Sequence, residues 1–250
     1  MKQEQRKMCG AVVKVLVGAG MLLGALAAQA VEFSVGRVGV ELAGDGWKEI
    51  PLPDRSQAFG GEKEGALSIQ GKLYLRESTG REGQTLVLVS ANSGGLGGGS
   101  AGYMTYNPVC HSDEQTFQEG NEGFSQRFAQ CLMVLPRYSS ESVFKTLAPE
   151  VLLLQASGEL SYQPGVYTVM SRHAISTGSF VDVMVFVTAP INADGAAVTD
   201  TLPKGVPPAH VAWGRQLKDA VKSSVYSLSG RLVVPPIRLE QPPSGSKGGG

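Results

Sequence analysis

The stretch VYTVMSRHAISTGSFVDVMVFVTA, residues 166–189, decides the fold of this chain. Two runs rich in β-branched and aromatic residues, 166–175 and 180–189, flank a Ser-Thr-Gly-Ser segment. This arrangement predicts a long antiparallel hairpin. The second run is largely apolar on both of its faces, so we expect it to lie at the centre of a sheet that is covered on both sides.

The other elements follow from hydrophobic periodicity. Alternation with period two predicts strands, and apolar residues three or four apart predict helices. The expected elements are strands at 33–42, 66–76, 84–91 and 128–135, a mid-chain helix with an apolar face from Val143 to Leu154, and a C-terminal helix at 209–228 capped by Gly230. The fold class is therefore α+β, a mostly antiparallel β-sheet packed by a C-terminal amphipathic helix and a second mid-chain helix.

The first 30 residues have the pattern of a secretory signal peptide. A basic segment, 1–14, precedes the uncharged apolar segment 15–28, and Ala28-Gln29-Ala30 supplies small residues for cleavage. The apolar segment is shorter than the roughly 20 residues that span a bilayer, although an uncleaved anchor is the alternative. We expect export to the periplasm or outside the cell, with cleavage after Ala30.

Cleavage would leave a single α+β globular domain at 31–239 and a tail at 240–250. The tail has no apolar side chain that could join a core, so we expect it to be disordered. No segment after the first 30 residues is long and apolar enough to span a membrane, and we expect no stable membrane insertion after cleavage.

The charge of the cleaved chain argues against binding to nucleic acid. The first 30 residues hold four of the 22 basic residues and one of the 22 acidic residues, which leaves a net charge of −3. Binding to nucleic acid needs clustered cations that displace phosphate counterions. The sequence therefore predicts a partner of another class.

Two cysteines, Cys110 and Cys131, remain after cleavage. An even number in an oxidising compartment predicts a disulfide, which would close a loop of about 20 residues and contribute about 3 kcal/mol. The alternatives are two buried thiols or a metal site that includes His111. Adjacent Cys110 and His111 have a poor spacing for chelation, so we expect no metal and no cofactor.

Residues 92–125 form a long region rich in glycine and polar residues, which predicts a loop. Its segment 97–102, GGGSAG, matches both G-x-G-x-x-G and G-x-S-x-G, the second with Ser100 as nucleophile. Neither motif has the helix that should follow it, and a mobile loop is the favoured interpretation.

A catalytic Ser100 would need a base and a carboxylate. The candidate bases are His173 and His210, and Asp182 or Asp200 are the candidates to orient them. The simpler interpretations are that His173 is a sheet residue and His210 a polar residue at a helix end.

Two further groups of side chains are candidates for binding. Tyr103, Tyr106 and Tyr138 lie around the glycine-rich and cysteine loops and could form a ligand or partner surface, or could only anchor those loops. Arg215, Lys218 and Lys222 share the polar side of the C-terminal helix. They could hold an acidic partner or an anionic membrane, but solvation of the helix is the favoured interpretation.

The sequence thus favours an exported, soluble protein of non-enzymatic binding or accessory type, compatible with a bacterial periplasm. Its partner would be an unknown protein or small ligand of the cell envelope, bound at 92–125. The alternatives are an envelope serine hydrolase that uses Ser100 and a structural envelope component without a discrete site.

Overall fold

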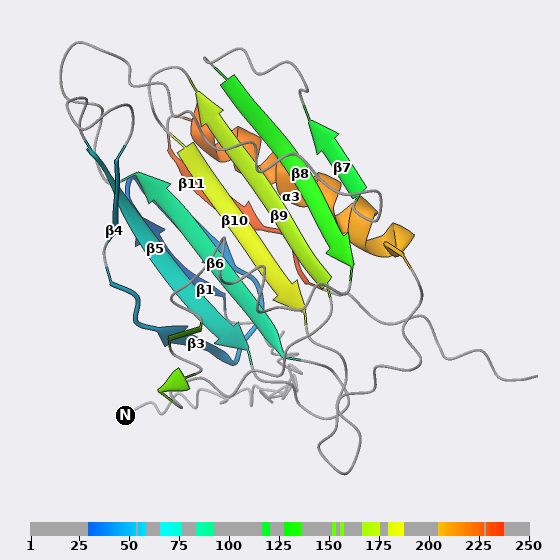
Figure 1. Cartoon of the computed structure of the whole chain (residues 1–250), viewed down its shortest axis with the longest axis horizontal. Coiled ribbons are helices and arrows are strands. Elements are labelled where there is room, and N and C mark those ends of the chain that lie inside the picture. Colours follow the sequence, from blue (N-terminus) through cyan, green and yellow to red (C-terminus); the bar gives the residue numbers. More distant parts are fainter. Residues whose placement is uncertain are drawn as a thin grey trace, which may run out of the picture.

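The structure, a computed structural model, describes residues 30–53, 55–58, 66–76, 84–92, 117–120, 128–136, 152–153, 156–157, 167–175, 180–187, 205–227 and 229–237. Most of these residues belong to β-strands, and Figure 1 shows their arrangement. The elements are β1 (Val31–Val35), β2 (Val38–Leu42), β3 (Trp47–Ile50), β4 (Arg55–Ala58), β5 (Ala66–Arg76), β6 (Thr85–Asn92), β7 (Phe117–Gly120), β8 (Phe128–Pro136), β9 (Tyr167–Ile175), β10 (Phe180–Val187), α3 (Pro208–Tyr226) and β11 (Arg231–Val234).

The large sheet has the strand order β3-β5-β6-β10-β9-β8-β7, and β4 pairs with the start of β5. All of its pairings are antiparallel. The hairpin expected at 166–189 is confirmed as β9 and β10, and β10 lies between β9 and β6. Because β10 is central, its side chains from Phe180 to Phe186 are all buried, as its two apolar faces predict.

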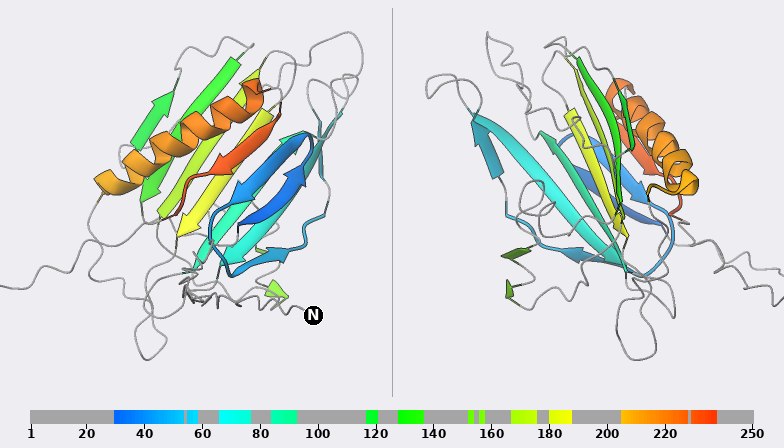
Figure 2. Two further views of the ribbon diagram at one scale, coloured as in Figure 1. Left: turned by 180° about the vertical axis from the view of Figure 1, so that it is seen from behind. Right: turned by 45° about the vertical axis from the view of Figure 1, so that its right-hand side comes forward.

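A second layer covers one face of this sheet. Helix α3 packs on β8, β9 and β10, and β1 lies over β5 and β6 (Figure 2). The strands β1, β2 and β11 form a separate sheet in which β11 runs parallel to β2. Two sequence predictions are corrected here. Residues 33–42 form two strands, β1 and β2, of this second sheet, and residues 117–120, expected to belong to the loop 92–125, form strand β7. Strands β3, β4 and β11 had not been expected.

The two faces of the large sheet carry separate apolar clusters. Valine and leucine side chains on the face under α3 pack with Trp213, Leu217 and Val221 of the helix. Gly214 brings the helix close, because a Cβ atom there would lie 2.9 Å from Cδ1 of Leu132. The opposite face holds leucines, methionines and Phe186, against which Leu52 and Leu152 pack.

The expected C-terminal helix is confirmed, but its cap is not Gly230. Helix α3 ends at Tyr226, and the backbone N–H of Ser227 donates to Ser223 O. Gly230 has a φ of +58° in the turn before β11, and a Cβ atom there would lie 2.9 Å from Arg37 O. Gly230 is therefore required by the return of the chain to β2 and does not cap the helix.

Residues 143–154, where a second helix was expected, lie largely outside the described residues. Within the part of the chain that the structure describes, no helix is long and apolar enough to cross a bilayer. The described residues therefore confirm a mostly antiparallel sheet with one packed helix.

Candidate functional site

The most unusual polar feature of the described structure is a buried ion pair between Arg172 and Asp182. The two residues lie directly opposite each other on β9 and β10. Arg172 Nε donates to Asp182 Oδ1 at 2.7 Å, and Nη2 donates to Oδ2 at 2.6 Å. Both side chains are about 95% buried, with exposed fractions of 6% and 5%. This is the two-point geometry in which guanidinium and carboxylate bind most strongly.

The pair belongs to a polar row that crosses the face opposite α3. Cys131 lies opposite Arg172 on β8, and Ser90 lies opposite Asp182 on β6. All four residues are buried. Charges that have lost their water are tolerated only when they are paired, so each member of the pair holds the other in place. Asp182 is therefore a structural anchor between two central strands.

The ion pair excludes the role that the sequence suggested for Asp182. Adjacent residues of a strand point to opposite faces, and His173 follows Arg172 directly. The ring of His173 contacts Tyr226 of α3, whereas Arg172 and Asp182 meet on the far side of the sheet. Asp182, one of the two candidates to orient a histidine base, does not orient His173, because the sheet lies between them.

His173 lies under the C-terminal part of α3. It is 1% exposed, and its ring meets that of Tyr226 edge to face with centroids 5.3 Å apart. Burial and, secondarily, the positive charge of Lys222 lower the pKa of His173 to about 4. The imidazole is therefore neutral near pH 7 and a weak base. The simple interpretation of His173 as a sheet residue is confirmed by its place in β9.

His210 occupies the third position of α3, near the other end of the helix. Its ring lies over Tyr167 with centroids 4.4 Å apart, and it is 4% exposed. Burial alone lowers the pKa of His210 to about 4. The predicted position at a helix start is confirmed, but the side chain is part of the packed interface between helix and sheet.

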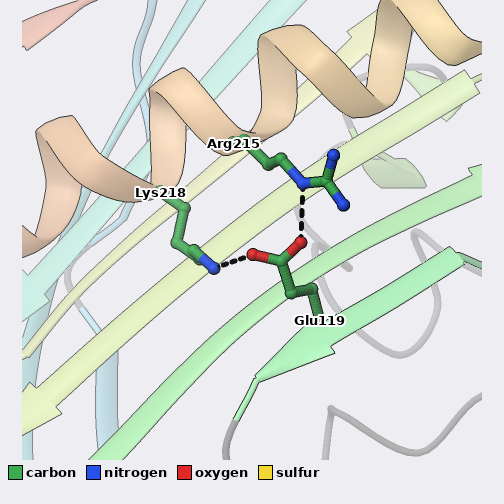
Figure 3. A network of polar contacts seen from close by, with 3 residues as sticks. All are labelled: Glu119, Arg215 and Lys218. Carbon is green, nitrogen blue, oxygen red and sulfur yellow. Dashed lines mark hydrogen bonds and ion pairs between the residues drawn. The ribbon is translucent and has the colours of Figure 1, made fainter.

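The basic side of α3 is joined to the edge of the sheet (Figure 3). Arg215 Nε donates to Glu119 Oε2 at 2.7 Å, and the Lys218 ammonium group donates to Oε1 of the same carboxylate. These hydrogen bonds, that from Lys218 first, lower the pKa of Glu119. Arg215 also lies over the ring of Phe117, 5.4 Å from its centroid. The interpretation that the helix carries these charges only for solvation is therefore incomplete, because two of them fasten β7.

Most of the predicted site lies outside the described residues. This applies to Ser100, Tyr103, Tyr106, Tyr138 and Cys110. Cys131 is described, and its side chain is fully buried on β8. The disulfide, the hydrolase motif and the tyrosine surface therefore stay predictions.

Sequence reasoning missed Arg172. A signal was present, because Arg172 and Asp182 are opposite charges within two apolar runs on either side of one loop. Among the described residues, no group of three or more histidine, cysteine or acidic side chains is arranged to hold a metal ion. No family model, curated protein or solved structure matches this chain.

Proposed function

We propose that the protein is exported and acts as a non-enzymatic binding or accessory protein of the cell envelope. The observation that carries the proposal is that the buried polar side chains at the centre of the protein make contacts within the fold. Asp182 is bound at two points by Arg172, and both His173 and His210 are buried and neutral between α3 and the sheet. These groups hold strands and helix together, which is the arrangement of a rigid scaffold that presents loops.

The proposed binding surface is formed by residues 92–125, with Tyr103 and Tyr106 as aromatic contacts. The region follows β6, which ends at Asn92, and its later part includes the edge strand β7 (Phe117–Gly120), which pairs with β8. Asn92 Oδ1 accepts a hydrogen bond from the backbone N–H of Phe180 at 3.0 Å, which fixes the point where β6 ends. A loop that starts from such a point is held at a defined place on the scaffold.

The proposal includes two structural elements, a disulfide and a second helix. A disulfide between Cys110 and Cys131 would tie the loop region to β8, a buried strand. A second helix would cover the face of the sheet opposite α3. The backbone N–H of Ser157 donates to Leu153 O at 2.9 Å, as in an α-helix, and Leu152 packs against that face.

Native mass spectrometry of the protein from its own exported fraction tests the proposal. The expected species begins at Val31, lacks two hydrogens relative to the reduced chain, and carries a ligand or partner that is lost on denaturation. A species that retains Met1 would overturn the export proposal.

Variants then test the surface. Deletion of 94–102, or Tyr103→Ala with Tyr106→Ala, should abolish that association. Tyr226→Ala is the matched control, since Tyr226 is 57% exposed on α3 and lies outside the proposed surface. Association that survives both loop variants would exclude residues 92–125 as the binding surface.

The hydrolase alternative predicts a different result. Ser100→Ala should abolish any ester or amide hydrolysis while partner binding remains. Hydrolysis that is present in the wild type and absent from Ser100→Ala would replace the binding proposal with the enzymatic one.

A further inference from the structure

The methionines of the described residues are not scattered through the core. There are three, Met133 on β8, Met170 on β9 and Met184 on β10, and they lie side by side in one row across the sheet. Met170 is directly opposite Met133 on one side and Met184 on the other. All three side chains point to the face opposite α3. Met133 is 5% exposed, Met170 0% and Met184 4%.

This register brings three thioethers within reach of one point. Neighbouring strands are about 4.8 Å apart, and directly opposite side chains on one face are the closest pairs in a sheet. Each methionine has three rotatable bonds, so the outer two can turn their sulfur atoms toward that of Met170. A three-coordinate sulfur site is therefore compatible with the backbone as it stands.

We propose that Met133, Met170 and Met184 form a binding site for a soft monovalent metal ion of the Cu(I) type. Thioethers are soft ligands that select Cu(I), whereas hard cations require oxygen ligands. The nearest oxygen ligand along β10, Asp182, is already bound at two points by Arg172. The site therefore selects against Ca²⁺ and Mg²⁺, and its neutral, buried ligands favour the lower charge of Cu(I) over Cu(II).

The ordinary explanation for buried methionine is that it fills irregular gaps in a core. On the β6 side the row continues through the branched aliphatic residues Leu88, Leu73 and Ile50, and on the β7 side Gln118 lies opposite Met133. Gap filling gives no reason for three methionines to be adjacent. A shared ligand gives one, because all three sulfur atoms must then lie on neighbouring strands.

The test is competition for Cu(I) between the purified chain and the chelator bicinchoninate, under anaerobic conditions with ascorbate. We expect one Cu(I) per chain. Met170→Leu should weaken binding by more than about 100-fold, since changes even outside the ligand set cost 10- to 100-fold in metal affinity. Leucine and methionine have similar volumes, so the variant should keep its fold, and its circular dichroism spectrum checks this.

Two controls separate the thioethers from other causes. Leu88→Ile, in the same row but without sulfur, should bind Cu(I) as the wild type does. The double variant Cys110→Ser with Cys131→Ser should retain binding. Failure of the chain to take Cu(I) from the chelator, wild-type affinity in Met170→Leu, or loss of binding in a cysteine double variant that keeps the wild-type circular dichroism spectrum would each overturn the inference. Because the measurement uses purified chain, its failure would leave the export and partner proposals untouched.

Discussion

Acidification from pH 7 to pH 5 should destabilise this protein through His173 and His210. Both have a folded-state pKa of about 4, below the value of 6.5 for an ordinary histidine. The unfolded chain therefore binds protons between pH 6.5 and 4, and the folded chain does not. The stability that each buried histidine contributes is present above pH 6.5 and is lost as the pH falls towards 4.

The expected loss follows from these pKa values. Each histidine changes the free energy of unfolding by up to about 1.4 kcal/mol per pH unit within the window, so the two together give up to about 2.7 kcal/mol per unit. From pH 7 to pH 5 this amounts to about 2 kcal/mol per histidine, or about 4 kcal/mol in total, as an upper value before solvent screening at the helix ends. A domain with a total stability of about 5–15 kcal/mol would lose a large share of it.

The assay is urea unfolding followed by tryptophan fluorescence at pH 7, 6 and 5. The variants are His173→Gln, His210→Gln and the double variant, and each single change should remove about half of the pH dependence, as the linkage argument requires. Hydrogen bonds from Lys72 and Lys218 lower the pKa values of Glu49 and Glu119, and both carboxylates are present in every variant, so their contribution cancels in the comparison. His111 is present in every variant and cancels in the comparison. A double variant that keeps the full pH dependence would refute the reasoning.

Three further outcomes are expected, each measured by urea unfolding. Asp182→Asn should cost about 3–5 kcal/mol because it leaves Arg172 buried without its counter-ion, whereas the apolar pair Arg172→Met with Asp182→Leu should recover most of that loss. Gly36→Ala should cost at least about 2 kcal/mol, since φ is +57° and the new Cβ atom would lie 2.3 Å from Asn92 O; Gly39→Ala, which has open space, should be near neutral. Glu119→Gln should cost no more than about 1 kcal/mol, because its ion pairs with α3 are partly exposed, and it should speed hydrogen exchange in β7.

Local patterns in the sequence predicted the central elements well. The run 180–189 is apolar on both faces, which only a covered central strand tolerates, and β10 is that strand. The apolar stripe of α3 likewise follows its helical period. In both cases the information lies within about twenty residues, so no knowledge of distant partners is needed.

The second sheet could not be predicted in this way. Strand β11 is four residues long, and its partner β2 lies almost two hundred residues earlier in the chain. A short strand has too few residues for alternation to be distinctive, and a parallel partner at that distance leaves no local signal. Gly230 was therefore assigned to the end of α3, although the turn into β11 is what requires it.

The candidate site depends on a register that the sequence leaves open. If Ser176–Ser179 were a symmetric four-residue loop, Ile175 would pair with Phe180 and Asp182 would lie opposite His173, on the same face. In the structure Phe180 pairs with Ala174, so Asp182 lies opposite Arg172 instead. A shift of one residue moves every side chain of one strand to a different partner and face.

The shifted register is favoured because it pairs the only two charged residues of the hairpin strands, whereas the symmetric one would bury Arg172 without a counter-ion on its own face. The same shift that removes a carboxylate from His173 also aligns Met170 with Met184. The register that pairs Arg172 with Asp182 therefore has two consequences. It separates Asp182 from His173, and it aligns two of the three methionines of the proposed metal site.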